Sequence, residues 1–212
     1  MPTEILLPDP PLWLTAPLLG EPHASRLLHI LDAELTWQRP TLRLYGREHV
    51  IPRAQVWMGD AEAHYRYSGR DFRPEPWHPA VAELRDRVIA ALADHGLHAG
   101  FNSVLLNRYA GGEERMGWHS DDEPELGPDP LIAAVSLGAE RPLRFRKKPG
   151  AAPPDDAEAS APFNAWLPHD SLLVMGPGVQ RTLQHALLPR RIPGLRISLT
   201  FRRVMGRHGA TV

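Results

Sequence analysis

Cysteine is absent from this chain of 212 residues. Disulfides, thiolate zinc sites, iron–sulfur clusters and a cysteine nucleophile are therefore excluded. Any metal ion must be held by nitrogen and oxygen ligands, which the 11 histidines and 25 acidic residues can supply. The missing thiols narrow the kinds of metal centre that this sequence can build.

A long hydrophobic run is also missing. The apolar stretch from Ile5 to Leu19 is interrupted by four prolines and has no basic start, so it predicts neither a membrane-spanning helix nor a signal peptide. Contents of 42% hydrophobic and 23% charged residues are ordinary for a soluble globular protein. We expect a cytoplasmic monomer without a membrane partner, folded as a single domain over 1–212.

Lysine is scarce, because Lys147 and Lys148 are the only two, and the net charge is −1. This balance argues against a generally basic nucleic-acid binder, but the charge is unevenly distributed. Residues 141–148 carry five basic side chains and no acid, and residues 186–212 carry six arginines and no acid. Two local basic patches suit a partner that touches one face, and arginine-rich surface decoration explains them equally well.

Helical periodicity is confined to two segments of the N-terminal half. Leucines at helical spacing predict an amphipathic helix over 21–35, and an apolar stripe predicts a second helix from Pro79 to near Gly96. The first 20 residues predict an extended, proline-rich arm. One short strand that turns at Gly46 into a loop is predicted over 41–49. Two further strands are predicted within 54–67, on both sides of a turn at 59–60.

After Gly100 the pattern changes to short strands separated by Gly and Pro turns. Such strands predict a sandwich or barrel, with the two helices packed outside it. Residues 147–162 have almost nothing to bury and predict a mobile loop. The predicted strands are 101–109, 131–137, 143–145, 171–175, 181–186 and 195–204.

Two side chains in the centre of the chain point to metal binding. His119 and Asp121 are two residues apart, and on an extended strand this spacing puts both on one face, within reach of one ion. The pair alone is weak, and a lone histidine such as His185 is more often a packing residue than a ligand. Together the three form a two-histidine, one-carboxylate set, which leaves coordination positions open as in non-haem Fe(II) oxygenases.

The last predicted strand carries the second chemical feature. Its apolar residues alternate with a polar face that holds Arg196, Ser198, Thr200 and Arg202. On a typical strand that face would meet solvent. Alternatively, the two guanidinium groups, whose planar geometry matches carboxylates, could grip the ends of a small dicarboxylate.

These motifs, in this order, resemble those of the AlkB family of Fe(II)- and 2-oxoglutarate-dependent dioxygenases. The resemblance covers about Leu44 to Arg203. It implies a fold of the α+β class with a mainly β core: a double-stranded β-helix (jelly roll) over 101–204, with an extension over 1–100 that carries the helices on one side and a nucleotide-recognition lid. The motifs are Asn107-Arg108-Tyr109, His119-Ser120-Asp121, Asp121-Asp122-Glu123 running into Val135-Ser136-Leu137-Gly138, His185, and Arg196-Ile197-Ser198-Leu199-Thr200-Phe201-Arg202.

The resemblance also implies roles for individual residues. Fe(II) would be bound by His119, Asp121 and His185. Arg196 would pair with the distal carboxylate of 2-oxoglutarate, helped by Asn107 and Tyr109, and Arg202 would contact the carboxylate nearer the metal. Ser198 stands where many members have asparagine, and because serine is shorter, one hydrogen bond to the cosubstrate does not carry over.

The implied reaction uses O₂ and 2-oxoglutarate, with ascorbate as an expected stimulant, and yields succinate and CO₂. The substrate would be hydroxylated on a methyl carbon attached to a base nitrogen, and the product would release formaldehyde. Bases of the 1-methyladenine and 3-methylcytosine type are the expected targets. In the DNA-repair members of the family the damaged base is flipped out of the duplex and stacked on aromatic side chains.

Alkylated DNA, as a duplex, is the expected substrate. Tyr65 and Tyr67 match the base-pocket segment of the repair members, and Glu123 matches the acid that faces the exocyclic amine. Tyr45 resembles the finger that fills the gap left by a flipped base. Phosphate contacts are expected from residues 144–148 and 190–191. The alternatives are an oxygenase acting on RNA, protein or a small molecule, and a non-enzymatic jelly-roll binding module.

Overall fold

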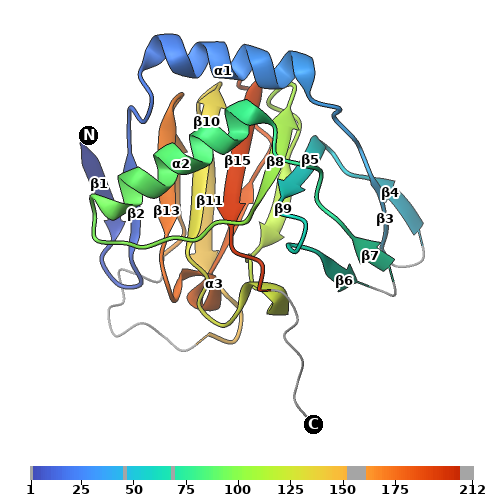
Figure 1. Cartoon of the computed structure of the whole chain (residues 1–212). Helices are drawn as coiled ribbons and strands as arrows, with labels where there is room; N and C mark the ends of the chain where they lie inside the picture. Colours follow the sequence, from blue (N-terminus) through green and yellow to red (C-terminus); the bar gives the residue numbers. More distant parts are fainter. Residues whose placement is uncertain (1, 45–46, 68–69, 152–160, 206–212) are drawn as a thin grey trace.

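The computed structural model describes residues 2–44, 47–67, 70–151 and 161–205, with side chains left undescribed at 42–47 and 65–72. Two antiparallel sheets form its centre (Figure 1). The larger sheet has seven strands, which are, in spatial order, β1 (Thr3–Leu7), β2 (Leu12–Thr15), β13 (Ser171–Met175), β10 (Ile132–Gly138), β15 (Arg196–Arg202), β8 (Ser103–Tyr109) and β5 (Ala54–Gly59). The smaller sheet has four, which are β12 (Phe163–Leu167), β11 (Arg141–Lys147), β14 (Leu183–Leu187) and β9 (Met116–His119).

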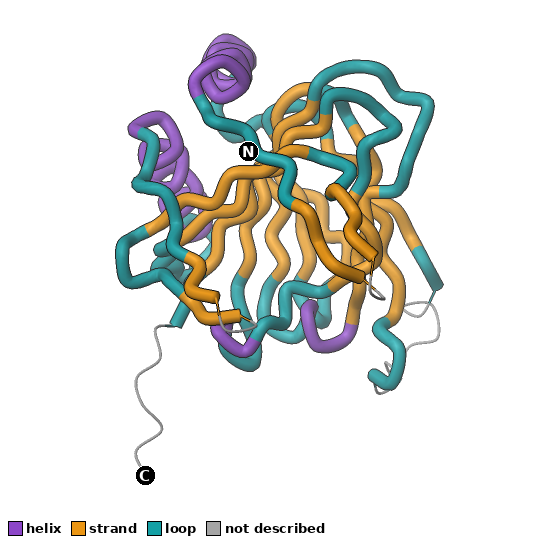
Figure 2. The backbone as a smooth tube through the Cα atoms, turned by 90° about the vertical axis from the view of Figure 1, so that its right-hand side faces the viewer, coloured by secondary structure: helices purple, strands orange, loops and turns teal. Residues whose placement is uncertain are grey.

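Two helices cover the outer face of the larger sheet. They are α1 (Glu21–Glu34) and α2 (Pro79–Ala93), and Figure 2 shows both on the same side of the strands. Their apolar stripes, which include Leu31 and Val88, pack with Leu199 and Phe201 of β15 in one buried cluster. The predicted arrangement of helices packed on one side of a jelly roll is therefore confirmed.

A second apolar cluster lies between the two sheets. Ile132 and Leu173 of the larger sheet meet Phe145 and Leu167 of the smaller sheet there. Because side chains on a strand alternate between two faces, β15 serves both layers: Ile197, Leu199 and Phe201 face the helices and the polar residues between them face the smaller sheet. The polar face of this strand is thus internal, and the solvent-facing alternative is wrong.

The N-terminal arm pairs with the larger sheet. β1 and β2 form a hairpin, and β2 is antiparallel to β13, with Leu14 opposite Leu173. Buried Asp170 then holds the start of α1, because its carboxylate accepts hydrogen bonds from the backbone N–H groups of Leu19 and Gly20. Such a contact satisfies donors that a helix start would leave unpaired. The extended conformation was predictable, whereas the sheet pairing was not.

Two small hairpins project beyond the β5 edge of the larger sheet (Figure 1). One consists of β3 (Thr41–Leu44) and β4 (Arg47–Val50), and the other of β6 (Tyr65–Tyr67) and β7 (Arg70–Phe72). Backbone hydrogen bonds tie their flanks to β5, from Gln38 to Gln55 and from Glu75 to Trp57 and Gly59. The predicted nucleotide-recognition lid would consist of this region.

Element boundaries differ from the predictions in several places. β9 and β12 were not predicted, because their sequences show no clear alternation of apolar and polar residues. The predicted strand 181–186 begins instead with a short helix, α3 (Val179–Thr182), which follows Gly178 in a left-handed conformation. A 3₁₀ turn, η1 (Pro124–Leu126), follows the first metal-ligand motif. The predicted mobile loop over 147–162 lies mostly outside the described residues. No helix of the described chain is long and apolar enough to span a membrane.

Candidate metal centre and cosubstrate pocket

One pocket opens between the two sheets and brings the predicted chemistry together. β8, β9, β14 and β15 all contribute to its wall. Its polar lining consists of Asn107, Tyr109, His119, Asp121, His185, Arg196, Ser198, Thr200 and Arg202, and its apolar lining of Met116, Ala134, Leu143, Leu167, Met175 and Leu187.

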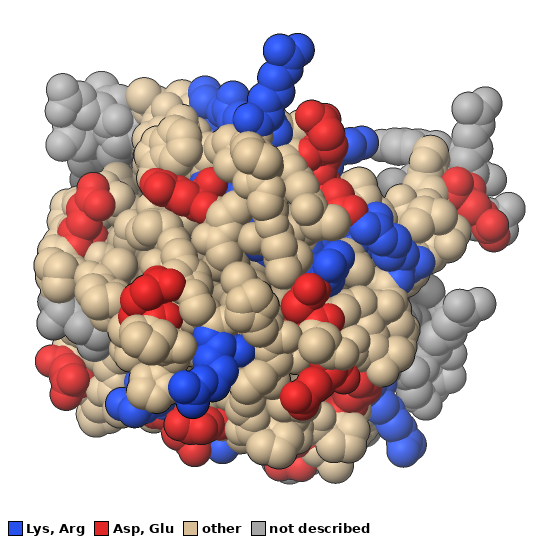
Figure 3. Space-filling model, turned by 90° about the horizontal axis from the view of Figure 1, so that it is seen from above, with Lys and Arg blue, Asp and Glu red and all other residues tan. Residues whose placement is uncertain are grey.

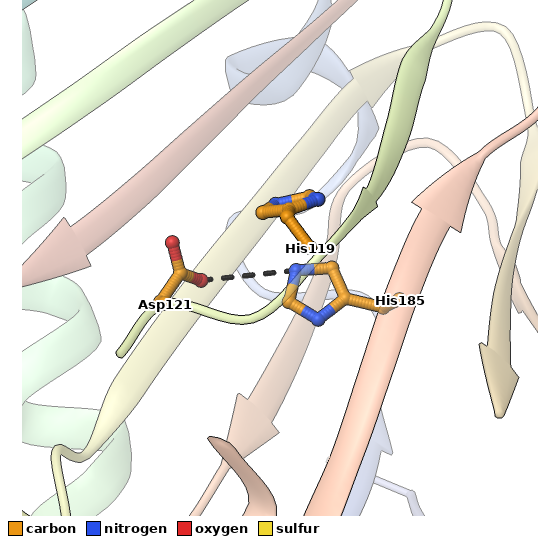
Figure 4. Close-up of side chains that lie close together, drawn as sticks. All are labelled: His119, Asp121 and His185. Carbon is orange, nitrogen blue, oxygen red and sulfur yellow. Dashed lines mark ion pairs between the residues drawn. The ribbon is translucent and has the colours of Figure 1, made fainter. Parts of the chain in front are cut away.

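His119, Asp121 and His185 form a compact triad in this pocket. One ligand atom from each residue lies within 4.8 Å of the others. His119 and His185 are directly opposite on the paired strands β9 and β14, and their ring centroids are 4.3 Å apart. Figure 4 shows the Asp121 carboxylate turned toward His185, with Oδ2 3.7 Å from Nε2. Asp121 lies two residues past the end of β9, so a bend, and not the strand spacing, brings it to the triad.

Hydrogen bonding selects the nitrogen that His119 offers to a metal. Its Nδ1 lies 2.8 Å from the backbone oxygen of Gly117. A carbonyl oxygen only accepts, so Nδ1 carries the proton and donates it, leaving the lone pair of Nε2 free. Partners of this kind orient the ligating histidines of metal sites.

Asp121 is held in place from three directions. The Arg202 guanidinium contacts Oδ1, the backbone N–H of Asp121 donates to Gln180 Oε1 at 2.9 Å, and the Ser120 hydroxyl donates to the Leu183 oxygen at 2.8 Å. Burial by itself would raise the pKa of Asp121, but the Arg202 guanidinium, followed by the two neighbouring imidazoles, lowers it below its ordinary value. The carboxylate is therefore ionised, as a metal ligand must be.

His185 is kept neutral by its surroundings. Burial, followed by repulsion from His119, lowers its pKa from 6.5 to about 3, although the Asp121 carboxylate opposes the shift. A neutral imidazole keeps a lone pair for a metal. Two histidines and one carboxylate, without thiolates, fit Fe(II) and leave coordination positions open.

Arg196 supplies a buried cation at the other end of the polar wall. It is 3% exposed, its Nη2 donates to Ser136 Oγ at 2.9 Å, and its guanidinium carbon lies 5.4 Å from the Tyr109 ring centroid. No carboxylate of the described residues pairs with it, and burial lowers its pKa to about 10. Gly138, where a Cβ atom would meet the Leu195 oxygen at 2.2 Å, allows the close backbone approach that starts β15.

Two arginine donors along β15 remain without partners. The buried Nε atoms of Arg196 and Arg202 have no hydrogen-bond partner among the described residues. An unsatisfied buried N–H is costly, so these donors fit the two carboxylates of a dicarboxylate that enters the same pocket. The residues present therefore fit 2-oxoglutarate together with Fe(II).

Asn107 and Ser198 form a cross-strand pair between the positions of Arg196 and Arg202 along the pocket wall. Asn107 is opposite Ser198 on the paired strands β8 and β15, and both line the pocket. Arg53 Nε donates to Asn107 Oδ1 at 2.6 Å, which orients the amide. Burial lowers the pKa of Arg53, and the Tyr109 phenol, opposing this, raises it. Burial raises the pKa of Tyr109, although nearby Arg196, Arg53 and Arg141 oppose this, so the phenol stays protonated.

The predicted substrate residues are placed less completely. Tyr45 lies outside the described residues. Tyr65 and Tyr67 belong to β6, but their side chains are not described. Glu123 is exposed at the start of η1 and does not line the pocket. The base-contacting roles of these four residues stay predictions.

Three residues that shape the site were not predicted from the sequence. Gln180 binds the backbone of a metal ligand, Arg53 binds Asn107, and fully buried Arg141 donates to the backbone oxygens of Gly111, Glu114 and Leu188. All three are polar side chains whose partners are distant in sequence. Nothing in the local pattern distinguishes them from surface residues.

Comparisons with known proteins agree with this geometry. The model of the 2OG-Fe(II) oxygenase superfamily matches residues 12–202. The mouse protein named DNA oxidative demethylase ALKBH2 is 36% identical over 194 residues, covering 89% of this chain and 78% of that protein. The human protein named alpha-ketoglutarate-dependent dioxygenase alkB homolog 3 is 34% identical, covering 85% of this chain and 62% of that protein. A solved structure, OsALKBH1, superimposes with a TM-score of 0.64 at 16% identity over 95% of this chain and 100% of that chain, which shows a common fold.

Proposed function

The chain belongs to the 2OG-Fe(II) oxygenase superfamily and, within it, to the AlkB family, and from this premise we propose that it demethylates alkylated bases in DNA. The targets are N-alkylated bases of the 1-methyladenine and 3-methylcytosine type, and the methyl carbon leaves as formaldehyde. The activity is direct repair of DNA alkylation. A monomer that works in the cytoplasm is part of the same proposal.

The pocket carries the proposal. A largely buried metal triad, in which His119 is partly exposed, and two arginines with unpaired donors face one cavity. The chain is 36% identical over 89% of its length to a mouse protein named DNA oxidative demethylase. The human protein with the same name is 34% identical over 194 residues. The substrate named for these relatives supports DNA as the substrate here.

The chain's own residues position and protect the reaction. His119 and His185 hold lone pairs toward the metal position, and Arg202 and Gln180 fix Asp121. Arg196, buried at the far end, binds a carboxylate where water does not screen its charge. When bound, Fe(II) and 2-oxoglutarate supply the oxidising power that puts one oxygen atom of O₂ into a methyl C–H bond. The hydroxymethyl group on nitrogen then leaves as formaldehyde and restores the base.

The side of the molecule that receives DNA is proposed from the hairpins. The pairs β3–β4 and β6–β7 stand beside β5, whose partner β8 carries Asn107 and Tyr109 of the pocket. They carry the predicted finger Tyr45 and the predicted base-pocket residues Tyr65 and Tyr67. Another candidate for the DNA-binding surface is the top face of the molecule over α1. Figure 3 shows acidic and basic side chains interspersed on this face, which does not suit a polyanion. Duplex DNA is the proposed form of the substrate.

Formaldehyde release tests the proposal. Matched duplex and single-stranded oligonucleotides carrying 1-methyladenine are incubated with Fe(II), 2-oxoglutarate and ascorbate. We expect release that is lost in the His119→Ala variant and is greater from the duplex. Tyr45→Ala is expected to reduce the duplex reaction more than the single-strand reaction, and equal losses would contradict the finger.

The absence of formaldehyde release would point to a substrate class other than DNA. Consumption of 2-oxoglutarate that depends on His119, without formaldehyde from either oligonucleotide, would refute DNA demethylation and keep the oxygenase. RNA carrying the same bases, then protein and small molecules, are the substrates to test next.

A further inference from the structure

The outer face of the four-stranded sheet is covered by no helix of the described chain. Figure 2 shows α1 and α2 on the other side of the strands. Side chains that alternate with the buried Phe145, Ala165 and His185 point away from the interior here, and of these Ala186 is itself buried. We call this surface the basic outer face, and it consists of Trp118, Arg144, Arg146, Asn164, Trp166 and Gln184.

Charge distinguishes this face from the rest of a nearly neutral protein. None of the four strands β9, β11, β12 and β14 contains Asp or Glu. Arg144 and Arg146 lie on the central strand β11, and Arg144 is opposite Asn164 on one side and Ala186 on the other. Basic side chains without neighbouring acids on their own sheet suit a polyanion.

Aromatic side chains flank these cations. Trp166 on the edge strand β12 is 51% exposed, which is unusual for so large an apolar side chain. At the other edge, the Arg146 guanidinium lies 4.1 Å from the centroid of the Trp118 ring. Gln184 Oε1 accepts from Nε and Nη2 of Arg146 at 3.1 and 2.9 Å, which holds the cation over the indole.

We propose that the basic outer face binds a single-stranded segment of nucleic acid. Phosphates contact Arg144 and Arg146, and an unpaired base stacks on Trp166, because single-strand sites combine a positive track with aromatic platforms. A duplex keeps the faces of its bases inside the stack and leaves Trp166 without a ring to pack against. The proposal rests on the proposed DNA substrate and concerns its single-stranded form, in addition to the duplex form proposed above.

The face lies on the opposite side of the edge strand β9 from the reaction pocket. Trp118 is the neighbour of His119 on β9, and three inter-strand spacings, about 14 Å in all, separate β9 from β12. A strand that delivers its base to the pocket past β9 continues across β14 and β11 toward Trp166. The face therefore binds nucleotides that flank the reacting base.

Binding to lesion-free DNA tests this proposal without turnover. The probe is a fluorescein-labelled, lesion-free DNA single strand of about 16 nucleotides, a length at the upper end of known single-strand sites. Its binding is measured by fluorescence anisotropy. Trp166→Ala is expected to weaken binding about 5- to 150-fold, and Trp166→Phe to restore most of it. Arg144→Gln is expected to lower the slope of log affinity against log salt by about 0.7.

Matched controls lie outside the four-stranded sheet. Ile5→Ala removes an exposed apolar side chain from β1, and Arg87→Gln removes an exposed charge from α2. Both are expected to bind the probe as the wild type does. Wild-type affinity in Trp166→Ala, or an equal loss in Ile5→Ala, would overturn the proposal, as would an equal loss by Trp166→Ala on a duplex of the same length. Because the assay needs no demethylation, failure of the proposed reaction would leave its result intact.

Discussion

Removing the buried charge of Arg196 has two effects of opposite sign. In the protein without cosubstrate, this guanidinium is 3% exposed and has one hydrogen bond to a described side chain, that of Ser136. We expect Arg196→Met, which keeps an unbranched apolar stem and removes the charged guanidinium, to stabilise the protein without cosubstrate. The same change should abolish stabilisation by 2-oxoglutarate.

The first magnitude follows from the pKa. Burial lowers the pKa of Arg196 from 12.5 to about 10, about 2.5 units, and at about 1.4 kcal/mol per unit this is about 3 kcal/mol against the charged form. Because both states are protonated below pH 10, the full cost is present at neutral pH and is relieved only as pH rises from about 10 to 12.5. Losing the hydrogen bond to Ser136 reduces this gain in the free energy of unfolding by about 1 kcal/mol. The net stabilisation of about 2 kcal/mol corresponds to a Tm about 4–8 °C higher.

The second magnitude concerns the cosubstrate. Truncating one partner of a buried charge pair costs about 2–5 kcal/mol, or about 30- to 5,000-fold in affinity. Thermal unfolding with Mn(II), in the presence and absence of 2-oxoglutarate, measures both effects, and Arg87→Met on the surface of α2 is the control for charge loss. A lower Tm in Arg196→Met without 2-oxoglutarate, or a 2-oxoglutarate-induced shift equal to that of the wild type, would refute the reasoning.

Three further predictions concern the metal triad. Asp121→Ala removes a ligand and should reduce succinate formation to background; near-normal succinate would contradict the metal assignment. Gln180→Met removes the acceptor of the Asp121 N–H and should weaken Mn(II) binding about 10- to 100-fold, measured by loss of the free Mn(II) electron paramagnetic resonance signal, whereas Thr15→Val, which removes a buried hydrogen bond at the far edge of the sheet, should not. In the metal-free protein, His185 becomes protonated near pH 6.5 in the unfolded state and only near pH 3 in the folded state. The free energy of unfolding should therefore fall by up to about 1.4 kcal/mol per pH unit as the pH is lowered from 6.5 to 3. His185→Gln should flatten that profile, and an unchanged profile would count against the low pKa.

Much of the fold was predictable where a pattern extends over several turns or residues. The stripe from Val81 to Leu92 predicted α2, and the alternation along β15 predicted a strand with one apolar face. β9 and β12 show no clear alternation of apolar and polar residues, and their pairing partners lie up to 71 residues away in sequence, as Met116 and Leu187 are paired between β9 and β14. The N-terminal hairpin was predictable as extended chain, but its pairing with β13 depends on residues about 160 positions later.

The sequence by itself determined the chemistry of the site, because the absence of thiols and the order of His119, Asp121, His185, Arg196 and Arg202 leave a two-histidine, one-carboxylate centre with arginines for a dicarboxylate. Only the tertiary structure decided how that chemistry is held. The bend that carries Asp121 past the end of β9 and the bond from Gln180 exist because strands distant in sequence pack into two facing sheets. The same packing decides which face of β15 is internal, since alternation places residues on two faces without saying which face meets solvent. Burial then sets the pKa values of His185 and Arg196, because desolvation acts only where neighbouring elements exclude water.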